Sequence, residues 1–106
     1  MDLKEQIISD INNNSIILYM KGTKEMPMCG FSNSVVQILN FYGVEFKDIN
    51  VLEDQNIRIK LSEHSNWPTI PQLFVNGELT DESVLTSGSR IQIGKFNLII
   101  TKVDKK

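Results

Sequence analysis

The chain has 106 residues, of which 41% are hydrophobic, and a formal net charge of −2. This length suits a single domain, which we expect to span residues 1–106. So weak a charge excludes the strongly basic field that recruits nucleic acid or anionic membranes. The apolar runs are too short for a membrane span and no signal or transit peptide is evident, so we expect a protein of the bacterial cytoplasm or the mitochondrial matrix.

Hydrophobic periodicity predicts helices and strands in alternation along the first part of the chain. The first helix contains Leu3 to Ile11 and ends at the run Asn12–Asn14. The continuous apolar run Ser15–Met20 predicts a strand buried on both faces. A second helix is expected from about Gly30 to Tyr42, stopped by Gly43. Its expected inner face consists of Phe31, Val35, Ile38, Leu39 and Tyr42.

The next segments complete an α/β pattern. We expect a strand over Val44–Val51, a helix over Glu53–His64 and a strand over Pro71–Val75. Asn76-Gly77 is a strong hairpin turn into Glu78–Leu79. The order predicts a β-α-β unit with parallel strands followed by a hairpin. Beyond residue 80, the apolar residues between Arg90 and Val103 fit either two strands or one helical face.

Cys29 is the only cysteine, and it stands directly before the second predicted helix. The unpaired N–H groups and the positive dipole end of a helix N-terminus favour a thiolate there. Composition alone leaves a buried, inert Cys29 as the alternative. Without a second cysteine, a mixed disulfide on Cys29 needs an external thiol such as glutathione to resolve it. The same thiolate can instead ligate iron.

Four segments carry a resemblance to a known family. They are Lys21-Gly22-Thr23, Cys29-Gly30-Phe31-Ser32, Trp67–Leu73 and Val75-Asn76-Gly77. In order and spacing, residues 1–79 closely resemble the monothiol glutaredoxins of the Cys-Gly-Phe-Ser class. The resemblance implies a thioredoxin-like α/β fold, in which helices flank a central mixed sheet. It also implies a 2Fe-2S cluster and glutathione as cofactors, with two subunits each supplying Cys29 and one bound glutathione.

The resemblance further assigns roles to individual residues. Lys21 and Arg58 correspond to residues that hold glutathione carboxylates, a task that suits the planar fork of arginine. A cis bond before Pro71 leaves the backbone of Ile70 free to pair with the cysteine moiety of glutathione. In the site that the resemblance implies, Cys29 is the catalytic residue and the metal ligand. The residues expected to bind the cofactor are Lys21, Gly30, Phe31, Arg58, Thr69, Ile70, Pro71 and Asp81.

The segment after Leu79 departs from the family pattern. Where relatives carry Gly-Gly-Cys-Asp to grip the γ-glutamyl end of glutathione, this chain reads Glu78-Leu79-Thr80-Asp81. Asp81 is the candidate for the missing acid. Residues 80–106 are therefore atypical for the family, and this change bears on glutathione affinity and cluster retention.

Three functions follow from this reading. The first is a carrier that passes a 2Fe-2S cluster to apo iron–sulfur proteins, as a homodimer when loaded and a monomer when empty. The second is an enzyme, a weak glutathione-dependent disulfide oxidoreductase acting through Cys29 alone. The third is a degenerate thioredoxin-fold module that only binds partners. The resemblance favours the carrier.

Overall fold

The computed structural model describes residues 2–79, so the expectations for residues 80–106, including Asp81, lie outside the described residues. Four strands form one mixed sheet in the order β2-β1-β3-β4. Strand β1 pairs parallel with β2 and antiparallel with β3, which pairs antiparallel with β4. The parallel first pair and the following hairpin confirm the expected topology. The strands are β1 (Ile16–Met20), β2 (Lys47–Asn50), β3 (Gln72–Val75) and β4 (Glu78–Leu79).

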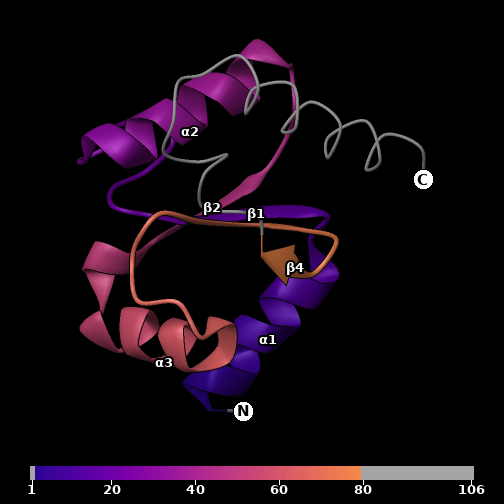
Figure 1. Ribbon diagram of the computed structural model, residues 1–106, viewed down its shortest axis with the longest axis vertical. Coiled ribbons are helices and arrows are strands. Elements are labelled where there is room, and N and C mark those ends of the chain that lie inside the picture. The colour runs from indigo at the N-terminus through magenta and orange to yellow at the C-terminus, as the bar shows by residue number, and fades with distance from the viewer. Residues whose placement is uncertain (1, 80–106) are drawn as a thin grey trace.

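Helices cover both faces of the sheet, with α2 on one side and α1 and α3 on the other (Figure 1). Their bounds are α1 (Leu3–Asn13), α2 (Gly30–Phe41) and α3 (Gln55–Ser65), and a short 3-10 helix, η1 (Val51–Glu53), precedes α3. All of β1 is buried, because Leu18 packs in the core under α2 while Ile17 and Tyr19 pack in the core under α1 and α3. The prediction of a strand buried on both faces is therefore confirmed.

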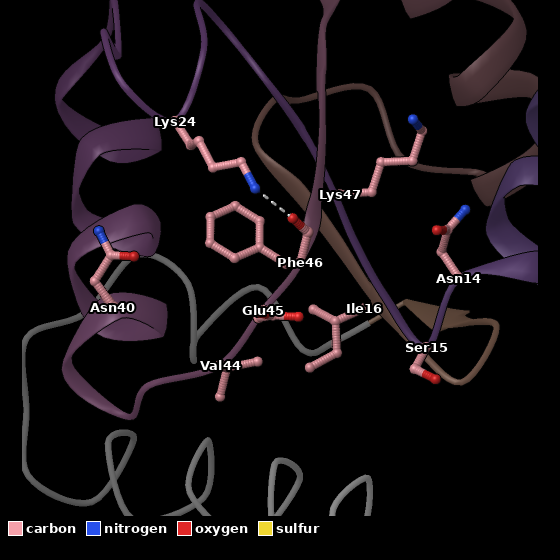
Figure 2. A pocket seen from close by; sticks show the side chains of 9 residues that line it. All are labelled: Asn14, Ser15, Ile16, Lys24, Asn40, Val44, Glu45, Phe46 and Lys47. Carbon is pink, nitrogen blue, oxygen red and sulfur yellow. Dashed lines mark hydrogen bonds between the residues drawn. The ribbon is translucent and has the colours of Figure 1, made fainter.

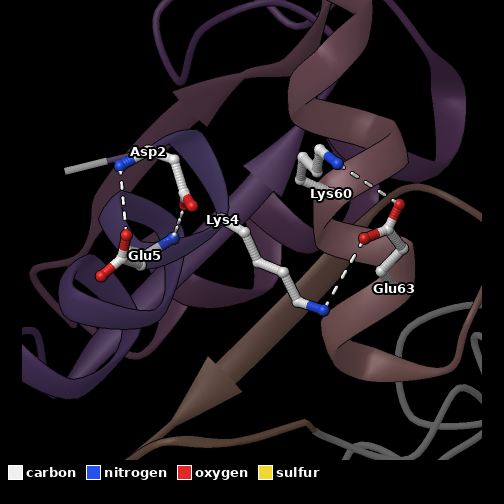
Figure 3. A network of polar contacts seen from close by, with 5 residues as sticks. All are labelled: Asp2, Lys4, Glu5, Lys60 and Glu63. Atoms are coloured by element: carbon white, nitrogen blue, oxygen red, sulfur yellow. Dashed lines mark hydrogen bonds and ion pairs between the residues drawn. The ribbon is translucent and has the colours of Figure 1, made fainter.

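Polar contacts fix the start of α1 and tie it to α3 (Figure 3). Asp2 forms a capping box with Glu5, in which the Glu5 N–H donates to Asp2 Oδ1 at 2.8 Å. Glu63 on α3 pairs with Lys4 of α1 at 3.7 Å and with Lys60 at 3.6 Å. Such half-exposed pairs contribute only about 0–1 kcal/mol each, so the buried apolar core supplies most of the stability of this layer.

The inner face of α2 differs from the expectation at Phe31, whose side chain is 58% exposed. The buried stripe is Ser32, Val35, Val36 and Leu39. These positions are spaced i, i+3, i+4 and i+7, which is one helical face. Phe31 lies at the edge of that stripe, in the first residues of the helix, and its side chain is mostly exposed. Its placement on the inner face was wrong, and Val36 and Ser32 take that place.

Two element bounds also differ from the predictions. Strand β2 begins at Lys47 rather than Val44, because pairing with β1 starts at Ile17↔Lys47. Helix α3 begins after Asp54, whose carboxylate caps it by accepting from the Asn56 N–H at 2.9 Å. The hairpin turn is confirmed: Asn76 and Gly77 both have positive φ, 53° and 87°. Within residues 2–79, no helix has the length and apolar character needed to cross a membrane.

Candidate functional site

Cys29 lies at the N-cap of α2, between an extended loop and the first helical turn. Its backbone is extended, with φ −151° and ψ 143°, and its side chain is partly exposed. Gly30 follows as the first helical residue, and a side chain there would meet no atom within 4 Å. The thiol is therefore placed at a helix N-terminus with open space beside it, as the sequence predicted.

The surroundings of the Cys29 sulfur favour the thiolate. Partial burial by itself raises the pKa of this thiol, but hydrogen bonds from the N–H and hydroxyl of Ser32 and from the Phe31 N–H lower it, as does the charge of Lys21. The net result is a Cys29 pKa below its ordinary value.

Ser32 connects the end of β1 to the start of α2. Its side chain is fully buried, and its hydroxyl oxygen accepts a hydrogen bond from the Lys21 N–H at 3.1 Å. The same hydroxyl stabilises the Cys29 thiolate. A single buried hydroxyl therefore fixes the position of Lys21 relative to the reactive sulfur.

The loop between Lys21 and Cys29 is held by side chains of β2. The Gly22 N–H donates to Asn50 Oδ1 at 2.9 Å and the Lys24 N–H donates to Asp48 Oδ2 at 2.8 Å. The loop also folds back on itself, since the Met28 N–H donates to the Lys21 carbonyl at 2.9 Å. These bonds return the chain to the sheet just before Cys29.

Lys24 anchors the same loop on the α2 side of the sheet (Figure 2). Its Nζ donates to the Phe46 carbonyl at 2.7 Å and lies 4.6 Å from the centroid of the Phe46 ring. A surface cavity of about 640 Å³ lies beside this contact, between the end of α2 and the start of β2. Cys29 does not line it, so this hollow is separate from the thiol.

The cis peptide bond expected at Ile70-Pro71 is present. The next residue, Gln72, is fully buried and holds the preceding segment: its Nε2 donates to the Trp67 carbonyl at 2.8 Å and to the Thr69 carbonyl at 3.1 Å. Strands β1 and β3 pair Tyr19 with Gln72. Continuing this antiparallel register beyond the strand ends brings Lys21 toward Ile70. The cis-proline segment and the Cys29 loop thus share one end of the sheet.

The remaining predicted cofactor residues border the cis-proline segment or lie outside the described part. Arg58 is exposed on α3, and its Nη2 donates to the Pro68 carbonyl at 3.4 Å. Thr69 is exposed, whereas the Ile70 side chain is 7% exposed. Ile70 makes none of the backbone hydrogen bonds found outside helices and strands in residues 2–79, which leaves its backbone available. The structure does not describe Asp81.

Three exposed apolar side chains lie close to Cys29 along the chain. Met26, Met28 and Phe31 are 69%, 63% and 58% exposed. All three lie within three residues of Cys29, on the loop and the first turn of α2. Apolar groups exposed together beside a reactive residue are typical of a surface that contacts a partner.

The sequence did not assign roles to several residues that shape this site. Ser32 could have been found from its place in the first turn of a helix that follows a cysteine, where an O–H faces the cap. Asn50, Asp48 and Gln72 gave no such signal. Their partners lie in other elements or in a loop whose path depends on tertiary contacts.

The arrangement places one activated sulfur at the same end of the sheet as a lysine and the cis-proline segment. Cys29 supplies the sulfur, Lys21 and Arg58 supply positive charge, and the backbone at Ile70 supplies hydrogen-bonding groups. Within residues 2–79, no group of three His, Cys, Asp or Glu side chains is placed to hold a metal ion. A metal centre here would need ligands beyond those of the described chain.

Comparison with known proteins identifies the class to which this fold and site belong. Residues 16–80 match the glutaredoxin family. A buckwheat glutaredoxin, solved as a complex with glutathione, aligns with a TM-score of 0.78 at 18% identity over 96% of this chain and 90% of its own. That likeness confirms the thioredoxin-like fold.

Two curated relatives narrow the class. The chain is 42% identical to "Glutaredoxin 4" of Buchnera aphidicola over 100% of its own length and 97% of that protein. It is 62% identical to "Probable monothiol glutaredoxin 2" of Rickettsia typhi over 65% of this chain and 62% of that protein. The match thus spans less than two thirds of the Rickettsia protein. The chain belongs to the glutaredoxin family and, within it, to the monothiol glutaredoxins.

Proposed function

We propose that this protein carries a 2Fe-2S cluster, ligated by Cys29 and glutathione, and passes it to apo iron–sulfur proteins. The observation that carries the proposal is the donor set. Residues 2–79 provide a single activated thiolate and no other group of metal-binding side chains. A 2Fe-2S cluster takes four ligands, most often thiolates. Two copies of Cys29 and two glutathione thiolates complete that number.

Glutathione fits the surface beside Cys29. It is an anionic tripeptide whose carboxylates suit Lys21 and Arg58, and whose cysteine backbone suits the free peptide groups at Ile70. The glutathione complex of the buckwheat relative supports this assignment. Asp81 stays a candidate for the γ-glutamyl end. A chain with one cysteine also suits a reducing compartment such as the cytoplasm.

The exposed apolar surface suits transfer between proteins. Met26, Met28 and Phe31 give two copies of the chain, or a copy and a recipient, an apolar contact around the sulfur. In such a contact the thiolates of a recipient would bind the iron and displace the Cys29 and glutathione thiolates, so that the cluster passes to the recipient. The bonds that exchange are those between the iron ions of the cluster and their thiolate ligands.

A second function is favoured by the lowered pKa of Cys29. The Cys29 thiolate could attack the glutathione sulfur of a mixed disulfide, forming a Cys29–glutathione disulfide and releasing the substrate thiol. A second glutathione would then restore Cys29 and leave as oxidised glutathione. This reaction and cluster binding use the same sulfur, so an experiment must separate them.

Anaerobic reconstitution with iron, sulfide and glutathione separates these functions. We expect a coloured protein whose visible absorption requires glutathione, and which converts an apo-ferredoxin to its holo form. Cys29→Ser should abolish the colour, whereas Ser34→Ala, a change at an exposed position of the same helix, should retain it. A colourless protein that reduces glutathionylated substrates would identify the oxidoreductase instead. A protein with neither behaviour would be a binding module.

A further inference from the structure

The turn between β3 and β4 presents an asparagine followed by a glycine at the surface. Asn76 is exposed and has a φ of 53°, and Gly77 has a φ of 87°. Two residues with positive φ form the tight turn that matches the twist of paired strands. The Asn76 N–H donates to the Ser15 carbonyl at 2.7 Å, which fixes the backbone of the turn against the residue before β1.

The side-chain amide of Asn76 and the backbone nitrogen of Gly77 are both left without hydrogen bonds. No group among residues 2–79 binds the Asn76 carboxamide. The Gly77 N–H likewise donates to no described residue. Glycine also has no Cβ that would hinder an approach to its nitrogen. The carboxamide carbon and the nitrogen of the next residue are therefore both free to react with each other.

The hairpin that contains this turn is short. Strand β4 has two residues, and two residue pairs join it to β3. It lies at an edge of the four described strands. So short an edge strand opens at a small cost compared with unfolding of the whole domain. Opening frees the backbone dihedral angles of Asn76, which must rotate before the Gly77 nitrogen can reach the carboxamide carbon.

We propose that Asn76 is a site of spontaneous deamidation, and that its conversion to isoaspartate releases β4. The Gly77 nitrogen attacks the Asn76 carboxamide carbon and loses its proton, and the carboxamide nitrogen leaves with that proton as ammonia. Water then opens the resulting succinimide to isoaspartate or aspartate, and no electrons are transferred. Isoaspartate carries the backbone through the side-chain methylene, so the lengthened turn no longer closes the pair Val75↔Glu78.

Asn66 provides a comparison within the same molecule. It is also exposed, its φ is 60°, and its carboxamide has no partner among residues 2–79. The residue that follows is Trp67, whose N–H donates to Ser65 Oγ at 3.2 Å and whose Cβ hinders an approach to its nitrogen. Asn66 therefore shares the backbone conformation and the exposure of Asn76, but it lacks a free nitrogen beside it.

Ageing of the purified full-length protein at mildly alkaline pH, followed by mass spectrometry of tryptic peptides, tests the reaction. Residues 61–90 form one peptide that contains both asparagines. Fragmentation should place the mass increase of an amide-to-acid change at Asn76 and leave Asn66 unchanged. An isoaspartyl methyltransferase should label the aged protein but not aged Asn76→Gly, which keeps a residue that tolerates positive φ. Equal conversion of the two asparagines, or an unchanged Asn76, would overturn the proposal.

Amide NMR of the aged protein tests the release of β4. The signals of Glu78 and Leu79 should shift in the isoaspartate form. Freshly prepared Asn76→Asp is the matched control, because it has the same charge on an ordinary backbone and should keep the strand paired. Signals of β4 that match those of this control would overturn the release of the strand. The result is independent of cluster binding, since Cys29→Ser should age like the wild type.

Discussion

Ser32 stabilises the Cys29 thiolate with its backbone N–H and with its hydroxyl. Its hydroxyl oxygen accepts from the Lys21 N–H, and the hydroxyl also stabilises the thiolate. Accepting one hydrogen bond polarises an O–H group and strengthens the bond that it donates. The backbone N–H groups at the start of α2 act in the same direction. A serine buried at this helical position is thus part of the site rather than of the core alone.

Replacing this hydroxyl should slow the reaction of Cys29 with alkylating agents. Because the wild-type pKa is lowered, thiolate forms at a lower pH than in free cysteine, and the rate rises with pH through that lowered value. In Ser32→Ala the midpoint of this rise should move to higher pH. At pH 7 the rate should fall about fivefold, the effect of one lost hydrogen bond. Stopped-flow alkylation with iodoacetamide across pH measures both.

Ser34→Ala is the matched control, because Ser34 is exposed on the same helix and its hydroxyl donates to the Gly30 carbonyl. It should leave the pH midpoint unchanged. An unchanged midpoint in Ser32→Ala would show that the helix N–H groups and Lys21 suffice without the hydroxyl.

Among the elements, the Lys21–Met28 loop depends most on backbone geometry. Gly22 has a φ of +92° and forms a bridge with Pro27. A Cβ at Gly22 would lie 2.5 Å from the Met26 carbonyl oxygen and 2.7 Å from Met28 N. Both are backbone atoms that cannot move aside without opening the loop. The close return of the chain toward Cys29 therefore requires glycine here.

Gly22→Ala should consequently destabilise the fold by about 1–3 kcal/mol, the range for backbone strain at such positions. Urea denaturation followed by circular dichroism gives this value. Gly30→Ala is the matched control, since Gly30 has no positive φ and no neighbour within 4 Å of an added Cβ. Equal stabilities of the two variants would mean that the loop does not adopt, in solution, the tight conformation that requires glycine at position 22.

A buried side chain, Gln72, also holds the Trp67–Pro71 segment. Gln72 donates from Nε2 to two carbonyls of this segment, and all of the Gln72 side chain is buried. Gln72→Leu keeps the volume but leaves both carbonyls without this donor. Unsatisfied groups of this kind cost about 1–3 kcal/mol each when buried. We expect lower stability and weaker glutathione binding, measured by urea denaturation and by calorimetry.

Gln37→Leu is the control for this change, because Gln37 is exposed on α2 and hydrogen-bonds only Asn33 among the described side chains. If Gln72→Leu binds glutathione as tightly as the wild type, the Trp67–Pro71 segment does not contribute to glutathione binding. A loss of binding without a loss of stability would identify Gln72 as a positioning residue.

At the scale of the whole molecule, local sequence signals account for much of the fold. The run over β1 has no polar residue between Ile16 and Met20, which indicates burial on two faces, and Asn76-Gly77 has the turn chemistry that its positive φ values require. The position of Cys29 before a helix was equally local. Phe31 was misplaced because the phase of a helix is least certain in its first turn, where few apolar residues define the face.

The contacts that complete the site are long-range and leave no local signal. The bond from Gly22 to Asn50 spans 28 positions, and that from Lys24 to Asp48 spans 24. Polar residues in a strand of this kind are equally compatible with solvent exposure. Their role appears only when β2 is placed beside β1, which brings these side chains under the loop. The family resemblance identified the candidate cofactor residues, but it did not identify the side chains of Asn50 and Asp48 that hold the loop.

Native mass spectrometry of the reconstituted protein shows whether two copies of the molecule share one cluster. We expect a complex of two chains, one 2Fe-2S cluster and two glutathione molecules. Cys29→Ser should yield only the monomer without iron. A cluster carried by a single chain, or a loaded dimer that lacks glutathione, would contradict the claim, because the described chain would then have to supply ligands other than Cys29.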